Sequence, residues 1–335
     1  MLARIAPALL LLLLAPLTAE FLLGDFSIRQ IALLFALLPQ YGGGALLIRE
    51  VARRSGRGWP TIVTLSVAYA LIEEGLNTQS LFNPNYVGQR LLDYGYIPVL
   101  GTSLLWAVFV LSIHVVWSIC TPILIAEGIA GPRRTTPWLK WLGLSVAAVL
   151  YVIGCVFTTQ YSLNTSHFVA PAIQLITVGI LAFAAIAAAF VAFKPASSRL
   201  PDARAADAPA AWVVAIVALV LSSGLHLSRY ATVRWMWPAS AGVVTMLVLE
   251  LVAILLVASW SRRRGWSANH FLAIATGTVL TYSWIGLAQF LNGTTNLGTP
   301  TTVLDDFGQV GEVAVVLALI AGAVWLRRDR SRLVQ

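Results

Sequence analysis

Residues 60–80 read PTIVTLSVAYALIEEGLNTQS, an apolar run that ends in a polar stretch with two adjacent carboxylates, Glu73 and Glu74. In a helix that rises about 1.5 Å per residue, these carboxylates lie roughly 20 Å along the axis. A run of this length and hydrophobicity is typical of a membrane span. Charge is costly within lipid, so ionisable residues in a span mark a function or a buried polar contact.

The composition of the whole chain agrees with this. Of its 335 residues, 59% are hydrophobic and 11% are charged, and the mean hydropathy is +0.82. A soluble domain carries about 25% charged residues, so a soluble enzyme is excluded. The two cysteines, Cys120 and Cys155, lie inside apolar runs and indicate neither a disulfide framework nor a cysteine metal site.

Ten apolar runs are long enough to cross a bilayer, and the first is expected to be a retained span rather than a cleaved signal peptide. Within lipid each backbone polar group must be satisfied internally, so each run is expected to be a helix. The predicted fold class is therefore all-α, a polytopic transmembrane bundle of about ten spans. The predicted spans are residues 5–24, 30–48, 60–80, 101–128, 140–160, 169–193, 211–228, 238–260, 269–291 and 308–326.

The basic residues predict the orientation. If the spans alternate from a cytoplasmic N-terminus, 18 Lys and Arg residues fall inside and 4 outside, which puts both termini in the cytoplasm. The net charge of +8 then reflects topology and contacts with anionic lipids at the cytoplasmic loops, and no nucleic-acid partner is expected. The predicted location is the plasma (inner) membrane. The four outside residues are Arg29, Arg90, Arg229 and Arg234.

The longest inside loop, 194–210, reads KPASSRLPDARAADAPA and is rich in Ala, Pro and small polar residues, which predicts a flexible linker. It divides the chain into a six-span N-terminal bundle, 1–193, and a four-span C-terminal region with a basic tail, 211–335. The N-terminal part carries the Glu pair and is expected to hold the site.

The polar residues of span 60–80 share one helix face. Glu73, Asn77 and Ser80 are spaced i, i+4 and i+7, and Glu74 lies beside them. Such a face is expected to point into the bundle, where the carboxylates would serve as general acid or base, metal ligand or proton carrier. The alternative is a helix end near the outer headgroups, wetted by the following loop.

His114 lies at the centre of the next span, with Ser118 one turn later. The pair is either a functional imidazole with an orienting hydroxyl or an ordinary interhelical hydrogen bond. We expect His114 to face Glu73 or Glu74, since an unpaired carboxylate within a membrane is costly.

Other carboxylates have separate interpretations. Glu20 and Glu312 lie near outer span ends and would join an outer polar cluster or sit among headgroups. Glu250 lies deep in span 238–260 and needs a partner from another helix. Glu50 and Glu127 lie beside Arg-rich loops, so ion pairing is expected for both.

Three consecutive glycines, Gly42 to Gly44, lie inside span 30–48. Glycine weakens a helix by about 1 kcal/mol relative to alanine, so three in a row need a reason. Close helix packing is the preferred interpretation, and a local break that lines a cavity is the alternative.

The Glu pair followed by a histidine on the next span resembles the CPBP (CAAX-protease and bacteriocin-processing) family of intramembrane proteases. Where that family has Glu-Glu-x-x-x-Arg, this chain has Thr78 in place of Arg. Phe109 and His114 are one residue further apart than in the family's Phe-x-x-x-His, and Leu-Ser-Arg-Tyr after His226 lacks the Asn of His-x-x-x-Asn. Residues 41–114 also resemble uncharacterised bacterial multi-pass membrane proteins.

Three functions follow from these observations. The first is an intramembrane hydrolase, a CPBP-like protease, in which Glu73 or Glu74 activates water and His114 binds or stabilises developing charge. The second is a transporter with a proton or cation path through Glu73, Glu74, His114 and Glu250. The third is a non-catalytic assembly or lipid-binding protein.

Overall fold

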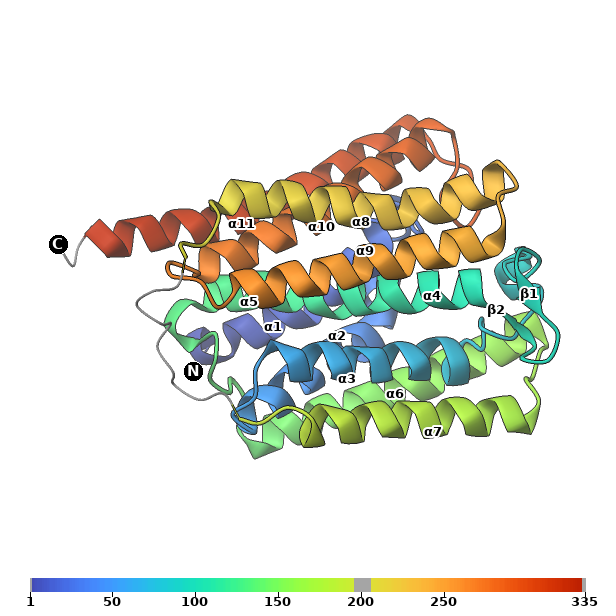
Figure 1. The fold of residues 1–335 in the computed structure, drawn as a ribbon, viewed down its shortest axis with the longest axis horizontal. Helices are drawn as coiled ribbons and strands as arrows, with labels where there is room; N and C mark the ends of the chain where they lie inside the picture. Colours follow the sequence, from blue (N-terminus) through green and yellow to red (C-terminus); the bar gives the residue numbers. More distant parts are fainter. Residues whose placement is uncertain (1, 196–205, 333–335) are drawn as a thin grey trace.

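The computed structural model describes residues 2–195 and 206–332, which form a bundle of long helices with connections at its two ends (Figure 1). A two-residue hairpin, β1 (Tyr96–Ile97) with β2 (Thr102–Ser103), lies in the loop before α4. The all-α class is confirmed. The helices are α1 (Leu2–Pro16), η1 (Leu17–Phe21), η2 (Ile28–Gln30), α2 (Ala32–Arg54), α3 (Trp59–Leu71), η3 (Ile72–Asn77), η4 (Tyr86–Gly88), α4 (Leu104–Ile113), η5 (His114–Cys120), α5 (Thr121–Ala130), η6 (Gly131–Arg133), α6 (Trp141–Ser166), α7 (Ala172–Val191), α8 (Ala211–Arg234), α9 (Ala239–Trp260), α10 (Ala268–Leu291) and α11 (Val303–Arg332).

Within the described residues, eight helices are long and apolar enough to cross a membrane, where ten spans were predicted. The eight include one continuous helix over Leu104–Arg133, formed by α4, η5, α5 and η6. The other two predicted spans are also helical but less regular. Residues 5–24 give the shorter apolar helix Ile5–Phe21, and residues 60–80 give α3 followed by the π-helix η3. The first of these helices is too short to be counted, and the second ends in the polar residues Glu73, Glu74 and Asn77.

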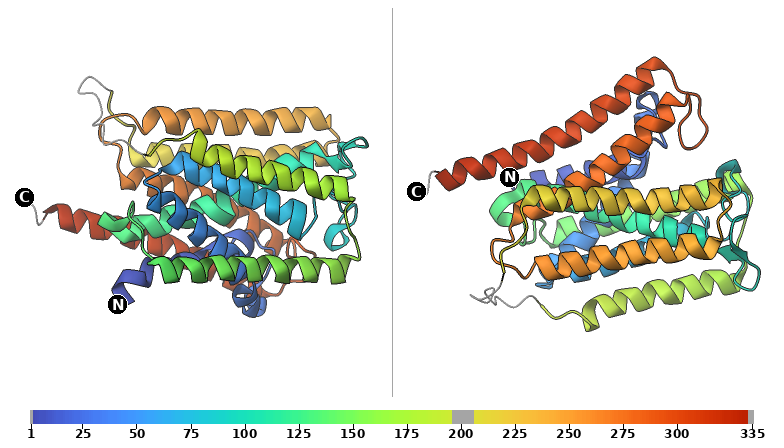
Figure 2. Two further views of the ribbon diagram at one scale, coloured as in Figure 1. Left: turned by 90° about the horizontal axis from the view of Figure 1, so that it is seen from below. Right: turned by 45° about the horizontal axis from the view of Figure 1, so that its top comes forward.

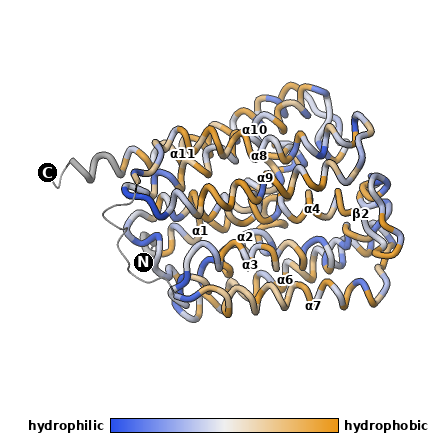
Figure 3. Tube along the Cα trace, viewed as in Figure 1, coloured by the Kyte–Doolittle hydropathy of each residue, from blue (hydrophilic) through white to orange (hydrophobic). Residues whose placement is uncertain are grey.

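The helices divide into an interior and a periphery. In their most apolar stretches, α2, Leu104–Arg133 and α10 are 56%, 61% and 56% buried, whereas α6, α8 and α9 are each 11% buried. The helices are hydrophobic along their lengths, as the orange colour of Figure 3 shows. The apolar faces that α6, α8 and α9 leave exposed are therefore suited to contact lipid.

Both chain ends lie at the same end of the bundle, together with the α2–α3, α5–α6 and α9–α10 connections (Figures 1 and 2). We call this the basic end, because these connections carry the predicted inside Arg residues. The hairpin loop and the α6–α7 and α8–α9 turns lie at the opposite end. Residues 196–205 of the predicted linker and the side chains of the predicted basic tail lie outside what the structure describes.

The glycine triplet has the packing role. Helix α2 is unbroken from Ala32 to Arg54. A Cβ on Gly42 would lie 2.2 Å from the carbonyl oxygen of Leu12, and one on Gly44 would lie 2.6 Å from the ring of Tyr69. Only glycine lets α2 approach α1 and α3 this closely, so the packing interpretation is confirmed.

Candidate functional site

Three helices change from α- to π-helical winding at the predicted polar residues. The π-helix η1 carries Glu20, η3 carries Glu73 and Glu74, and η5 carries His114 and Ser118. A π-turn inserts one extra residue per turn, which redirects side chains, and such turns are frequent at functional sites.

The segments are held against one another across the bundle. The hydroxyl of Thr18 in η1 donates to the carbonyl oxygen of Trp117 in η5 at 2.9 Å. Helix η5 also packs against α3, just before the Glu pair. The packing of three distant chain segments therefore brings the predicted residues into one place.

His114 faces Glu74, as predicted for one member of the pair. The imidazole Nε2 lies 2.6 Å from Glu74 Oε1, and Nδ1 lies 3.0 Å from the hydroxyl of Ser118. The side chains are buried, with 5% of Glu74 and 6% of His114 exposed. The ring lies beside those of Tyr41 and Tyr69, with its centroid 6.1 and 6.3 Å from theirs. Both ring nitrogens are thus occupied, and the imidazole is fixed in one orientation.

The second oxygen of Glu74 is also engaged. Glu74 Oε2 accepts hydrogen bonds from the hydroxyl of Ser80 and, at 3.4 Å, from that of Thr78. The Ser80 oxygen accepts in turn from Trp106 Nε1 at 3.2 Å. Thr78 and Ser80 lie in the turn after η3 and Trp106 lies in α4, so Glu74 is held by this turn on one oxygen and by His114 on the other.

Glu73 is more loosely held than Glu74, although only 2% of it is exposed. Its carboxylate accepts one long hydrogen bond, 3.4 Å from Asn77 Nδ2, and Asn77 Oδ1 accepts from Thr159 at 3.4 Å. Tyr69, whose ring lies beside His114, interacts electrostatically with Glu73. The Tyr69 hydroxyl is buried and has no hydrogen-bond partner within the described part of the chain. A carboxylate with open acceptor positions and an unused phenol therefore lie in one buried region.

Glu20 completes what we call the carboxylate cluster, namely Glu20, Tyr41, Tyr69, Glu73, Glu74 and His114. Its carboxylate accepts a hydrogen bond from the Tyr41 hydroxyl, and it interacts electrostatically with Glu74 and His114. The cluster lies in the half of the bundle away from the basic end, since Glu20 and the Glu pair are near the far ends of their helices. Glu20 therefore lies in a polar cluster, which is one of its two predicted interpretations.

Asp25, in the loop after η1, connects the cluster to the opposite end of the bundle. Its side chain hydrogen-bonds to Glu20 and to Asn296. Burial, and then the neighbouring charge of Glu20, raise the pKa of the Asp25 carboxyl well above its usual range. Asp25, Tyr41 and Tyr69 were not predicted as site residues from the sequence. Each is an ordinary residue type for its position, so no local pattern marked it.

Two other predicted carboxylates lie elsewhere. Glu250 on α9 accepts a hydrogen bond from Ser112 on α4, which is the partner that the sequence did not name. Glu312 on α11 is buried, and neither of its carboxylate oxygens has a hydrogen-bond partner among the described residues. His226 packs edge-on against Phe109 and Trp117, with centroids at 5.1 and 5.0 Å, in an aromatic environment.

A second buried polar group lies at the basic end, and we call it the ion-pair network: Arg49, Glu50, Arg53 and Glu127. Glu127 Oε2 lies 2.6 Å from Arg53 Nη2, and Glu127 Oε1 lies 3.1 Å from Arg49 Nε. Glu50 pairs with Arg49 and also accepts the backbone N–H of Trp138 at 2.9 Å. The predicted ion pairing of Glu50 and Glu127 is confirmed.

Across the described residues, there is no group of three or more His, Cys, Asp or Glu side chains arranged to hold a metal ion. The chemistry available to the carboxylate cluster is proton transfer, hydrogen bonding and charge stabilisation by carboxylate, imidazole and phenol groups.

Comparison with known proteins places the chain in a family. An uncharacterized membrane protein family has a model that matches residues 9–329. No curated protein and no solved structure matches the chain. The comparisons give no support to the CPBP resemblance. The chain belongs to this uncharacterized membrane protein family, and it is an integral multi-pass membrane protein.

Proposed function

We propose that this protein is an intramembrane hydrolase whose active site is the carboxylate cluster. The single observation that supports this most is the 2.6 Å contact between Glu74 Oε1 and His114 Nε2, buried inside the bundle. An imidazole between a carboxylate and a hydroxyl is held ready for proton transfer.

The two carboxylates are given different roles. Glu74 and Ser118 hold His114, so Glu74 is a positioning residue. Glu73 has open acceptor positions and is the general base: it takes a proton from water, whose oxygen then attacks a carbonyl carbon. The free hydroxyl of Tyr69 donates to the carbonyl oxygen and stabilises its negative charge, with the ring of His114 held beside it by Glu74 and Ser118. The proton held by Glu73 then passes to the leaving group. The substrate is an ester or amide that lies within the membrane.

The test compares membranes from cells that lack the gene with membranes from cells that express wild-type protein, Glu73→Gln or Glu250→Gln. Mass spectrometry of lipids and membrane peptides is expected to show one uncleaved species that accumulates in the deletion and in Glu73→Gln cells. Wild type and Glu250→Gln are expected to remove it, and in H₂¹⁸O the product acid carries the label. If no species distinguishes Glu73→Gln from wild type, the hydrolase proposal is wrong.

A proton-coupled transporter is the second candidate, and one observation favours it. The protonatable side chains of Asp25, Glu20, Tyr41 and His114 form a series that runs from a loop at the opposite end to Glu74. Such a series is a possible proton path. In proteoliposomes with a pH gradient, a transporter would show substrate-dependent proton flux that Glu74→Gln abolishes, whereas a hydrolase would show none.

In the proposed topology, the protein crosses the plasma membrane ten times, and both termini lie in the cytoplasm. This topology rests on the basic end, which holds both termini and the Arg-rich connections. Reporter fusions at the C-terminus and in loop 81–99 test it. The C-terminal fusion is expected to be cytoplasmic and the loop fusion external, and a cytoplasmic loop 81–99 would contradict the scheme.

A further inference from the structure

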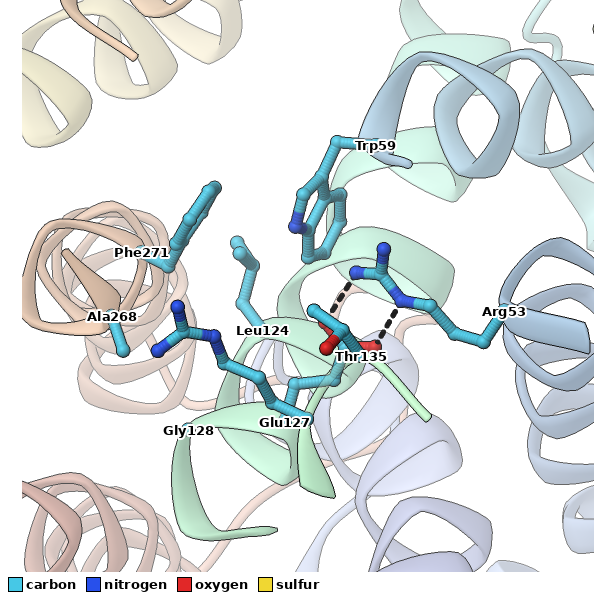
Figure 4. A pocket seen from close by; sticks show the side chains of 9 residues that line it. Arg53, Trp59, Leu124, Glu127, Gly128, Thr135, Ala268 and Phe271 are labelled. Carbon is cyan, nitrogen blue, oxygen red and sulfur yellow. Dashed lines mark hydrogen bonds and ion pairs between the residues drawn. The ribbon is translucent and has the colours of Figure 1, made fainter. Parts of the chain in front are cut away.

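A cavity of about 120 Å³ lies at the basic end, far along the bundle from the carboxylate cluster. Helices α3, α5 and α10 and the connection after α5 supply most of its lining (Figure 4). A single water needs roughly 10–15 Å³ of such volume, so the cavity has room for a larger group. Its lining residues are Arg53, Trp59, Leu124, Glu127, Gly128, Arg134, Thr135, Ala268 and Phe271.

The charges around this cavity do not balance. Glu127 is already paired with both Arg53 and Arg49, and Arg49 is also paired with Glu50. The guanidinium of Arg134 has no hydrogen bond or ion pair with the residues that the structure describes. Three guanidinium groups therefore face two carboxylates, and the additional positive charge lines the cavity.

Part of the lining is apolar. Trp59 and Phe271 stack with centroids 5.8 Å apart, and both rings point into the cavity in Figure 4, beside Leu124. Thr135 is exposed, so the cavity opens at the end of the bundle, where headgroups meet water in the proposed topology. Guanidinium groups and aromatic rings in one cavity together suit an anionic group attached to an apolar stem.

We propose that this cavity binds the phosphate group of a membrane lipid, with Arg134 as its principal ligand and the two aromatic rings against the glycerol and first acyl carbons. The site is independent of the hydrolase proposal, because it shares no residue with the carboxylate cluster. Inorganic phosphate presents the same kind of oxygen atoms to Arg134 as a lipid phosphate does. The experiment therefore compares the binding of a phospholipid with that of inorganic phosphate.

The experiment measures binding by calorimetry to the purified full-length protein in neutral detergent. The probes are short-chain phosphatidylglycerol, inorganic phosphate and short-chain diacylglycerol, which lacks the phosphate. Wild type is expected to bind phosphatidylglycerol, and Arg134→Gln is expected to weaken that binding about tenfold or more, as loss of a charged hydrogen bond implies. Arg262→Gln is the matched control, an exposed arginine at the same end, and it should bind as wild type does.

The other arms complete the test. Weaker binding of inorganic phosphate than of phosphatidylglycerol assigns the site to a lipid, whereas equal binding keeps the anion site and makes its ligand soluble. Thr135→Glu places a negative charge at the exposed mouth of the cavity without removing a buried contact. It is expected to weaken phosphatidylglycerol binding, so the proposal can be tested even if Arg134→Gln does not fold. Equal phosphatidylglycerol binding by wild type and Thr135→Glu, or equal binding of diacylglycerol and phosphatidylglycerol by wild type, would overturn the proposal.

Discussion

The carboxylate cluster and the ion-pair network differ in how their buried charges are compensated. In the ion-pair network, Glu50 and Glu127 are matched by Arg49 and Arg53, and backbone N–H groups fill further acceptor positions. The carboxylate cluster instead contains several carboxylates and one imidazole, and no Arg or Lys within the described residues pairs with them.

The difference separates a structural role from a functional one. In a network with matched partners, the charged groups hold the helix ends together, and few donor or acceptor positions remain free to bind a substrate. The carboxylate cluster keeps a loosely held Glu73 and an unused hydroxyl on Tyr69, although each unsatisfied buried group costs about 1–3 kcal/mol. Stability alone does not explain such an arrangement, whereas a site that awaits water or substrate does.

The largest expected effect comes from breaking the ion-pair network. Glu127→Gln leaves two buried guanidinium groups without their shared carboxylate, and we expect a loss of about 3–5 kcal/mol in the free energy of unfolding. Thermal unfolding in detergent measures it. Asp93→Asn, which breaks the exposed Arg90–Asp93 pair, is the control and should change little. If the Glu127→Gln protein is as stable as wild type, the ion-pair network does not stabilise the fold and its structural role is contradicted.

A smaller effect is expected at Asp25, where the cluster approaches the opposite end. The pKa of this carboxyl is raised in the folded protein, so the native state holds the proton more tightly than the unfolded state does. Stability should therefore fall as pH rises from the usual pKa of 3.8 toward the raised value, by at most about 1.4 kcal/mol per pH unit. Asp25→Asn should flatten that slope and be more stable than wild type at neutral pH. An unchanged slope in pH-dependent unfolding would contradict the raised pKa of this carboxyl.

The smallest expected effect on stability is that of Glu73→Gln. The amide keeps the shape of the carboxylate, and the only contact affected is the long hydrogen bond from Asn77. We expect a change within about 1 kcal/mol, measured beside Glu127→Gln under the same conditions. If both variants lose stability equally, the distinction between the two polar groups fails.

Much of the fold could be predicted from the sequence, because hydrophobic length and charge placement are local properties. The helical class, the connections with Arg residues and the pairing of Glu50 and Glu127 all follow from them. The contact between Glu74 and His114 was also predictable, since intramembrane charge seeks a partner and these residues lie on consecutive spans.

The rest of the site depends on how distant helices meet. The positions of Tyr41 and Tyr69 around His114 depend on the close approach of α2 to α1 and α3, which Gly42 and Gly44 allow. The partnership of Glu250 with Ser112 likewise depends on how α9 rotates against α4. The π-turns are a further case, because the sequence pattern does not distinguish them from regular α-helix. Hydrophobic periodicity identifies a helix and its apolar face but does not give these relative rotations.

The central claim is that the carboxylate cluster acts on a substrate, and complementation of a gene deletion by folded variants tests it most directly. Glu73→Gln and His114→Gln proteins are first checked for expression and unfolding temperature, and Glu250→Gln serves as the intramembrane control. Losing a positioned base typically costs about 10²–10⁴-fold in rate, so both cluster variants are expected to be stable yet fail to restore the deletion phenotype, while Glu250→Gln restores it. Full rescue by stable Glu73→Gln and His114→Gln proteins would contradict the account and make the cluster a structural feature.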